Sequence, residues 1–139
     1  MARKISFQKI LNVDSNKALE VVTNFNDYSN FIPGCTSATL ISRNLPIEIG
    51  RLEFNLLGKD YYIESENTID DCSITIKQLK GPFEKFRGKW SVTYIEKSLC
   101  QIDFDATYEL PFLLNAITPE HLVNNFSKNI IDSFIERVS

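Results

Sequence analysis

The side chains that could do acid–base or nucleophilic chemistry are few and scattered along the sequence. His121 is the only histidine, and it falls in the first turn of a predicted helix, on the polar side. No serine and acid can be grouped with it into a catalytic triad. Asp103 and Asp105 share one face of a predicted strand, as do Glu64 and Glu66 of another, and the first pair lies opposite the apolar side chains of its strand. A general acid needs burial to raise its pKa, and neither pair shows a sign of it. The sequence therefore gives no positive support for an enzyme.

Metal-ligating and cofactor-binding patterns are absent as well. Cys35, Cys72 and Cys100 are isolated and odd in number, without a CxxC pair, a Cys/His cluster or a glycine-rich phosphate loop. We therefore expect no metal, no resident cofactor and no disulfide framework. No stretch approaches the roughly 18 apolar residues of a membrane span, and the first five residues lack the apolar run of a signal peptide. These features favour a cytoplasmic protein.

The composition is that of one folded domain, which we expect to cover residues 1–139. With 43% hydrophobic and 24% charged residues, the chain is not expected to be disordered. Its formal net charge of -3 produces no general basic field, so DNA is not an expected partner. Ten phenylalanines and five tyrosines predict an aromatic-rich interior, which is common around apolar ligand sites.

The longest regular pattern is a helix predicted over 118–138. Thr118 is a suitable N-cap, Pro119 suits the first helical position, and Glu120 suits the helix dipole. The apolar side chains cover about 220° of the helical wheel, a wider stripe than a surface helix shows. They are Leu122, Val123, Phe126, Ile130, Ile131, Phe134, Ile135 and Val138. Such a helix needs burial over most of its circumference.

Strand-like patterns precede this helix. A first strand over 4–13 is followed by a short helix capped at Asp14 or Ser15 and by a turn-rich segment at 24–30 that suits a second small helix. From 35 to 110 we predict a meander of short strands separated by turn signals. The clearest alternation places Phe86, Gly88, Trp90, Val92 and Tyr94 on one face of a strand, and Ile102, Phe104, Ala106, Tyr108 and Leu110 on one face of the next. Sheets with one apolar and one polar face are antiparallel.

These elements combine into an α+β fold. We expect a curved antiparallel sheet of six to seven strands wrapped around the C-terminal helix, with two short helices after the first strand. A sheet and a helix that do not pack flush leave a space between them, and this space is the candidate ligand site. The alternative is that the inward aromatic side chains fill it as plain core.

The connection before the last helix is almost wholly apolar, although loops normally run over the wet surface. Residues 110–117 read LPFLLNAI, and they include Phe112 and Leu113. Together with Phe31 and Pro33, this segment is our candidate mouth, through which an apolar ligand enters from a membrane. The alternative is a buried connector.

Positive charge gathers in one predicted hairpin. Lys80, Lys85, Arg87 and Lys89 surround a single acid, Glu84, whereas residues 60–71 carry five acids and no base. The basic hairpin could meet anionic lipid headgroups or ribosomal RNA. It could equally be a solvated edge that discourages strand pairing.

Two motifs resemble a known family. The segment DYSNFIPGC at 27–35 is similar to the Y-x-x-F-[LI]-P-x-C pattern of the coenzyme-Q-binding START-like family, within the SRPBCC superfamily of polyketide cyclase/dehydrase type. The segment GPFEKFRGKW at 81–90 resembles the same family's G-P-F-[KR]-x-L-x-G-x-W pattern, with Phe86 in place of the usual leucine. The order of predicted elements resembles the START-like helix-grip fold along essentially the whole chain.

The resemblance implies an apolar cavity between the sheet and the C-terminal helix. Such a cavity would hold ubiquinone or another polyprenyl lipid, and family members are thought to act as quinone carriers or chaperones in respiration, which implies transient contact with the inner face of the membrane. RatA-type members interfere instead with association of the ribosomal subunits, which makes the large subunit a possible partner, and superfamily relatives include polyketide cyclases and aromatases. The expected lining residues are Phe31, Phe54, Leu56, Ile74, Ile76, Trp90, Phe104, Tyr108, Phe112, Leu113, Leu122, Phe126 and Ile130. Of these, Tyr108 is the residue expected to hydrogen-bond a quinone carbonyl; a core tyrosine satisfied by the backbone is the alternative.

Overall fold

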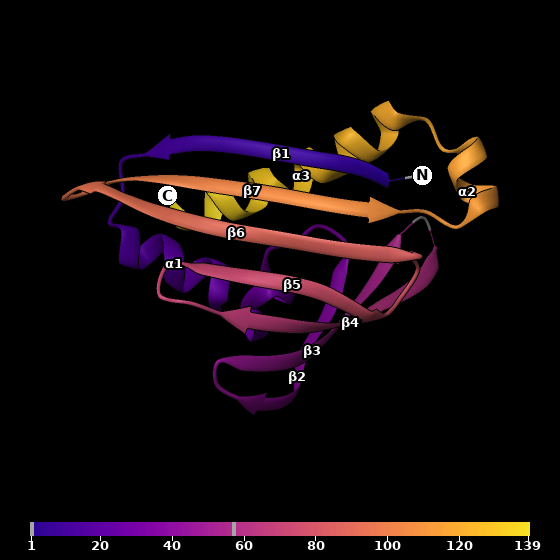
Figure 1. Ribbon diagram of the computed structural model, residues 1–139, viewed down its shortest axis with the longest axis horizontal. Coiled ribbons are helices and arrows are strands. Elements are labelled where there is room, and N and C mark those ends of the chain that lie inside the picture. Colours follow the sequence, from indigo (N-terminus) through magenta and orange to yellow (C-terminus); the bar gives the residue numbers. More distant parts are fainter. Residues whose placement is uncertain (1, 57) are drawn as a thin grey trace.

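Seven strands and four helical segments make up the computed structural model, which describes residues 2–56 and 58–139 (Figure 1). In chain order they are β1 (Ala2–Leu11), α1 (Ser15–Thr23), the 3-10 helix η1 (Phe25–Asn30), β2 (Cys35–Asn44), β3 (Ile47–Leu56), β4 (Lys59–Ile69), β5 (Ser73–Lys80), β6 (Lys85–Glu96), β7 (Leu99–Glu109), α2 (Phe112–Ile117) and α3 (Glu120–Val138). The predicted order of elements is confirmed, except that the connection before the last helix contains the helix α2.

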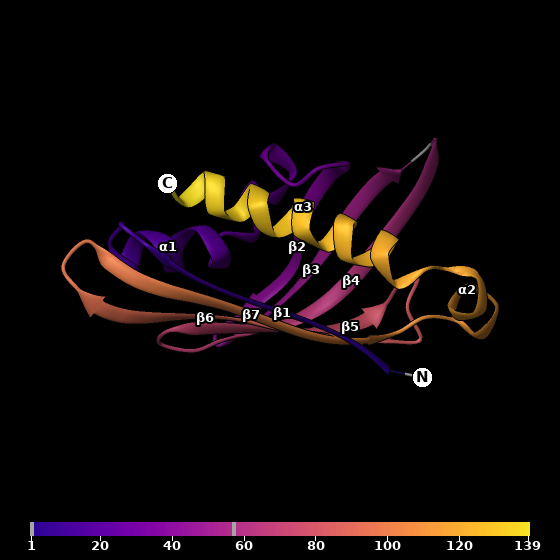
Figure 2. The same cartoon turned by 90° about the horizontal axis from the view of Figure 1, so that it is seen from above.

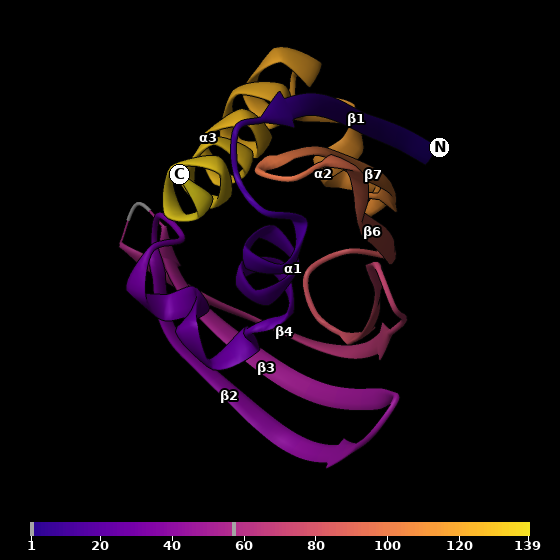
Figure 3. The same ribbon diagram turned by 90° about the vertical axis from the view of Figure 1, so that its left-hand side faces the viewer.

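All the strands belong to one antiparallel sheet with the order β1-β7-β6-β5-β4-β3-β2. Successive strands from β2 to β7 pair as hairpins, and β1 closes the other edge by pairing with β7. The sheet curves so that α3 and α1 both lie on its concave side (Figures 2 and 3). This is the predicted helix-grip arrangement, and it is confirmed.

Side chains alternate across the sheet as the sequence indicates. Gly88, Trp90 and Val92 of β6 are buried on the concave face, and Ile102 and Tyr108 of β7 are buried beside them. Tyr94 lies opposite the buried Cys100 and so shares the predicted face, but it is 65% exposed. The β6–β7 pairing shifts register between Tyr94 and Glu96, where the hairpin extends past the helices that cover the concave face (Figure 1).

The two short helices after β1 seal one end of the concave face. Asp14 is the N-cap of α1, as predicted, and its side chain accepts a hydrogen bond from the backbone N–H of Asn16 at 2.9 Å. The Tyr28 hydroxyl of η1 donates to the carbonyl of Val22 and is fully buried. A Cβ on Gly50 would lie 2.4 Å from the ring of Phe25, so only glycine lets η1 approach β3 this closely.

Helix α3 differs from its prediction in two respects. It begins at Glu120 rather than Thr118, because Pro119 occupies the N-cap position and makes no side-chain cap bond. Burial is confined to its second half, where Ile131, Phe134, Ile135 and Val138 are buried. In its first half Leu122 is 54% and Phe126 39% exposed, so the expected burial of most of the circumference is wrong there. Figure 2 shows the reason: α1 lies beneath the C-terminal half of α3 only.

The apolar connection before α3 is also not a loop. Residues 112–117 form the helix α2, in which the backbone N–H of Asn115 donates to the carbonyl of Pro111 at 2.8 Å. Forming a helix satisfies backbone groups that an apolar loop would leave unpaired, which explains how so apolar a segment connects two elements.

Candidate functional site

The second half of α3 is held on the sheet by a closed aromatic cluster. The ring centroid of Phe134 lies 4.8 Å from Trp90, 4.9 Å from Phe31 and 5.2 Å from Tyr28. Trp90 in turn lies 4.7 Å from Phe104. Aromatic packing of this density makes the C-terminal half of α3 part of the core.

Beneath the first half of α3, a transverse row of the sheet presents Arg3, Tyr108 and Phe86 on the concave face. Arg3 of β1 pairs with Tyr108 of β7, which pairs with Phe86 of β6. Phe83 packs against both aromatic neighbours, at 5.2 Å from Phe86 and 5.7 Å from Tyr108 between ring centroids. Phe86 also leans over Gly88, since a Cβ there would lie 3.4 Å from its ring. The floor of this region is therefore aromatic, with one cation at its edge.

That cation, Arg3, fixes the connection between α2 and α3. Its Nε donates to Asn115 Oδ1 at 3.0 Å, and its Nη2 donates to the carbonyls of Asn115 and Thr118 at 3.0 and 2.9 Å. Its Nη1 is buried without a hydrogen-bond partner in the described structure. Burial raises the pKa of the Tyr108 hydroxyl, and the neighbouring Arg3 partly offsets this. Arg3 and Tyr108 thus form a polar end to an otherwise apolar region.

Two further buried polar atoms without a described partner lie on the same concave face. They are Glu48 Oε1 and Asn67 Nδ2, which belong to directly opposite residues of β3 and β4. Asn67 Oδ1 accepts from the Ser65 hydroxyl at 2.8 Å, and Glu48 pairs with Arg43 at 3.1 Å. Buried polar groups are normally satisfied, so this face carries unused donor and acceptor capacity at both ends.

The residues predicted to line the cavity divide into three groups. Those packed in or against the core are Phe31, Phe54, Ile74, Ile76, Trp90, Phe104, Tyr108 and Ile130. Leu122 and Phe126 are exposed on the first half of α3. The side chains of Leu56, Phe112 and Leu113 lie outside the described part of the structure. Whether the other ten residues contact a ligand stays a prediction.

Sequence reasoning missed Arg3, Glu48 and Asn67. The signal for Arg3 was present, because it shares the strand face of Ile5 and Phe7, where a charged residue is unexpected. Glu48 and Asn67 could not be found in this way, since their burial depends on the helices that cover β3 and β4.

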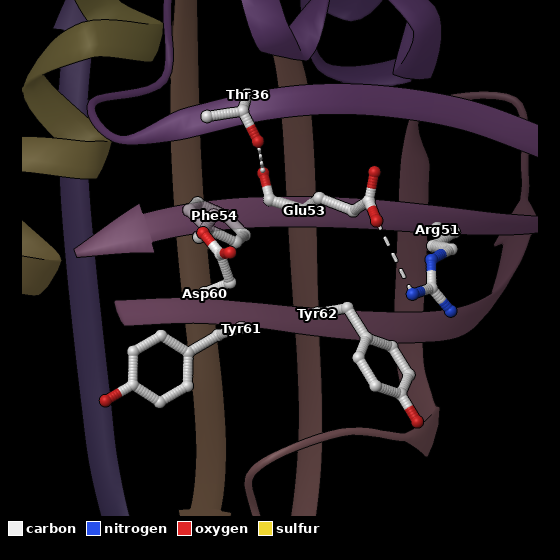
Figure 4. A pocket seen from close by; sticks show the side chains of 7 residues that line it. All are labelled: Thr36, Arg51, Glu53, Phe54, Asp60, Tyr61 and Tyr62. Atoms are coloured by element: carbon white, nitrogen blue, oxygen red, sulfur yellow. Dashed lines mark hydrogen bonds and ion pairs between the residues drawn. The ribbon is translucent and has the colours of Figure 1, made fainter. Parts of the chain in front are cut away.

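Among the hollows of the described surface are two that include no residue of α3. The first, of about 310 Å³, lies over β2, β3 and β4 (Figure 4). In it the Arg51 guanidinium lies 3.9 Å from the Tyr62 ring centroid and pairs with Glu64 at 2.9 Å and Glu53 at 3.5 Å. Because Arg51 is already paired with two carboxylates and stacked on a tyrosine ring, we assign these contacts to the stability of the sheet and not to a ligand.

The second hollow, of about 410 Å³, crosses β1, β7, β6 and β5. Its lining residues are Lys4, Ile5, Ser6, Thr75, Arg87, Gly88, Lys89, Asp105, Ala106 and Thr107. The cations of the predicted basic hairpin therefore lie in two places. Arg87 and Lys89 line this hollow on the outer face of β6, whereas Lys85 pairs with Glu109 at 3.8 Å and Lys80 ends β5.

The groups considered for catalysis occupy the outer surface. His121 is exposed, Asp103 accepts from Gln8 at 2.9 Å, and Asp105 accepts from Ser6 at 2.7 Å. Burial raises the pKa of the Cys35 and Cys100 thiols, which lowers their reactivity at neutral pH. Within residues 2–56 and 58–139, no three His, Cys, Asp or Glu side chains are grouped to hold a metal ion. No helix in the same ranges has the length and apolarity to span a bilayer.

Solved structures with the same fold include bacterial proteins of several kinds. A Thermus thermophilus protein matches with a TM-score of 0.82 at 16% identity, covering 98% of this chain and 97% of that one. A START superfamily protein from Mycobacterium smegmatis has a TM-score of 0.79 at 14% identity (97% and 93% covered). An aromatase/cyclase from a Streptomyces species has a TM-score of 0.74 at 13% identity, and the match covers 96% of this chain and 94% of that one.

Sequence relatives carry the name ribosome association toxin RatA. The protein from Vibrio cholerae is 18% identical over 136 residues, which cover 97% of this chain and 94% of that protein. The one from Escherichia coli K12 is 21% identical over 135 residues, 96% and 85% of the two chains. A family model described as polyketide cyclase / dehydrase and lipid transport matches residues 11–137. The chain therefore belongs to this START-like family, as a relative of its RatA-named members.

Proposed function

We propose that this chain binds a hydrophobic lipid, with ubiquinone or another polyprenyl lipid as the leading candidate, between the concave face of the sheet and the first half of α3. The observations that carry the proposal are the exposure of the apolar side chains Leu122 and Phe126 on the first half of α3 and the buried polar pair of Arg3 and Tyr108 on the sheet. The chain would act as a quinone carrier or chaperone that supports respiration. This role is one of binding and needs no catalytic group.

The apolar part of the site suits a prenyl tail. Burying each methylene group contributes about 0.8 kcal/mol, so a tail of several prenyl units would stabilise the complex strongly. Leu122 and Phe126 lie one helical turn apart, and Ile130 continues their line toward the aromatic cluster. The tail would cover these side chains, which the protein alone leaves in water.

The polar end fits a head group with acceptor oxygens. Arg3 Nη1 is a buried donor without a described partner, and Tyr108 carries a buried hydroxyl beside it. A quinone carbonyl accepts hydrogen bonds from both kinds of donor. An uncharged hydrocarbon would leave the Arg3 donor unsatisfied, at a cost of about 1–3 kcal/mol.

Lipid exchange would occur at the end formed by α2 and the start of α3. Phe31 of the predicted mouth is not part of this end, because its ring packs 4.9 Å from Phe134 in the second half of α3. Ile117, the last residue of α2, is 74% exposed, and Leu122 follows on the next helix. Exposed apolar side chains grouped at one end are typical of a surface that contacts membrane. We propose transient, peripheral contact with the inner face of the membrane during exchange.

The test is extraction of the native protein with organic solvent, followed by mass spectrometry. Wild type is expected to yield a quinone or other prenyl lipid, and Leu122→Asp/Phe126→Asp to yield much less. The matched control is Ile10→Asp/Ile41→Asp, which makes the same change at two apolar side chains of the strands β1 and β2 that are exposed to 57% and 54%. Equal lipid recovery from both double variants, or no lipid from wild type after growth under respiring conditions, would contradict the proposal.

A second candidate is association with the large ribosomal subunit. It is favoured by relatives named ribosome association toxin that match 96–97% of this chain. Sucrose-gradient profiles of cells overproducing the chain test it, and accumulation of separate subunits at the expense of whole ribosomes is expected. Profiles identical to those of cells with an empty vector would contradict it.

A further inference from the structure

We propose that the outer face of the sheet binds the phosphate backbone of RNA through a transverse row of three cations, Lys4, Arg87 and Lys77. Lys4 of β1 lies opposite Thr107 of β7, Thr107 lies opposite Arg87 of β6, and Arg87 lies opposite Lys77 of β5. The cation row thus crosses four neighbouring strands, over about 14 Å at the usual strand spacing. Two of its members, Lys4 and Lys77, lie outside the basic hairpin that the sequence indicates.

The strongest observation is that two cations, Arg87 and Lys77, lie directly opposite each other on neighbouring strands. Directly opposite residues of antiparallel strands have their Cβ atoms about 5 Å apart, and like charges in such a pair destabilise the sheet. Carboxylates normally relieve this repulsion, as Glu109 does for Lys85. Among the described residues, neither Arg87 nor Lys77 nor Lys4 has an ion-pair partner within 4 Å. On its other side Lys77 lies opposite Glu66, which compensates this cation in part, and a bound anion would offset the repulsion that remains at Arg87.

The surroundings of the row suit phosphate. Lys4, Arg87 and Thr107 line the 410 Å³ hollow together with Thr75, and the two threonine hydroxyls are potential donors to phosphate oxygens. The hollow also contains one carboxylate, Asp105, which would repel an anion. Asp105 accepts from Ser6 at 2.7 Å and lies opposite Lys89, so its charge is locally balanced. The net positive charge of the hollow therefore belongs to Lys4 and Arg87, and Lys77 extends the row beyond the hollow, opposite Glu66.

An RNA backbone fits this row better than a membrane does. The row is bordered by acids, with Asp103 and Asp105 on β7 and Glu66 opposite Lys77 on β4. A flat anionic bilayer would face these acids as well, whereas a nucleic-acid strand can follow the line of cations. None of the exposed large apolar side chains belongs to the residues that line the hollow. The choice of RNA over other polyanions rests on the second proposed function.

Binding of a short fluorescein-labelled RNA hairpin, measured by fluorescence anisotropy against salt concentration, tests the proposal. Lys77→Glu/Arg87→Glu should weaken binding by roughly tenfold or more and reduce the salt slope by about two, because two phosphate contacts are lost. The matched control, Lys80→Glu/Lys85→Glu, makes the same charge change at the tip of the same hairpin and should change affinity less than about threefold. Thermal melting of each variant verifies folding.

Each alternative outcome is decisive. Absence of RNA binding by wild type, or equal weakening in both double variants, would overturn the proposal. So would binding of phosphatidylglycerol vesicles, but not RNA, in a manner that depends on Lys77 and Arg87. If Lys77→Glu/Arg87→Glu loses RNA binding but, when overproduced, still alters ribosome profiles as wild type does, the cation row binds RNA. Another surface of the protein then acts on the ribosome. If overproduced wild type leaves the ribosome profiles unaltered while RNA binding depends on Lys77 and Arg87, only the second proposed function is overturned.

Discussion

Arg3 of the first strand lies directly opposite Tyr108 of the last strand, and its guanidinium donates to the carbonyls of both Asn115 and Thr118. The N-terminal strand thereby fixes the position of the α2–α3 connection at the open end of the concave face. One side chain combines an architectural role with the polar end of the proposed ligand site. The two roles can be separated by experiment.

Replacing Arg3 should loosen the α2–α3 connection and change Tyr108. Arg3→Ala removes three hydrogen bonds from a charged donor, with an expected loss of about 2 kcal/mol in the free energy of unfolding, measured by urea denaturation. The pKa of Tyr108 should rise further, because the Arg3 charge that lowers it is gone; ultraviolet titration of the phenol measures this. Arg3→Lys keeps the charge but loses the planar guanidinium. The pKa of Tyr108 should therefore return closer to its wild-type value than the free energy of unfolding does. An unchanged titration in Arg3→Ala would show that the two groups do not interact.

The two halves of α3 should differ in their contribution to stability. Phe134 contacts three aromatic rings and is buried, so Phe134→Ala should cost about 3–5 kcal/mol in the free energy of unfolding. Phe126 is 39% exposed, and Phe126→Ala should cost much less, of the order of 1 kcal/mol. Both values come from urea denaturation of lipid-free protein. Similar losses for the two variants would mean that the first half of α3 is packed like the second, which would leave no room for a ligand.

The periodicity of the sequence was sufficient to predict the fold but not the packing of α3. Alternation in β6 and β7 identifies the buried face, since burial on one side of a strand repeats every second residue. The helical stripe from Leu122 to Val138 predicts an apolar surface equally well along its length. Which half is covered depends on where α1 ends relative to α3, and this is a tertiary relationship that no local pattern contains.

The candidate site shows the same limit. Tyr108 could be placed on the inward face from its strand alone, but its neighbour Arg3 comes from the other end of the chain. Similarly, Arg87 was predicted as part of a basic hairpin with Lys80 and Lys85, which are its sequence neighbours. The register of β5, β6, β7 and β1 instead aligns Arg87 with Lys77 and Lys4. Strand pairing joins residues far apart in sequence, and so the cation row could not be read from spacing.

Alkaline conditions should destabilise the protein through Tyr28. Burial first, and then the Glu48 carboxylate, raise the pKa of its hydroxyl above the ordinary value. The stabilisation is complete below the unfolded-state pKa, at about 10, and is lost as pH rises from there toward the raised folded-state pKa. The free energy of unfolding should therefore fall above about pH 10. Tyr28→Phe should lower stability at neutral pH, because the hydrogen bond to Val22 is lost, and should flatten the decline. A decline as steep in Tyr28→Phe as in wild type would assign the alkaline sensitivity to other groups.

Arg87→Glu should stabilise the fold while it weakens RNA binding. The substitution replaces a like-charge cross-strand pair with an opposite-charge pair facing Lys77, for a gain of about 0.5 kcal/mol in the free energy of unfolding at low salt. The gain should shrink as salt screens the charges. Arg87→Gln, which removes the repulsion without adding attraction, should fall between wild type and Arg87→Glu. Urea denaturation at two salt concentrations measures all three proteins. A loss of stability in Arg87→Glu would mean that Arg87 stabilises the sheet, and would contradict the proposal that its charge serves an external anion. A gain in stability together with weaker RNA binding would show that stability is given up for binding at this position.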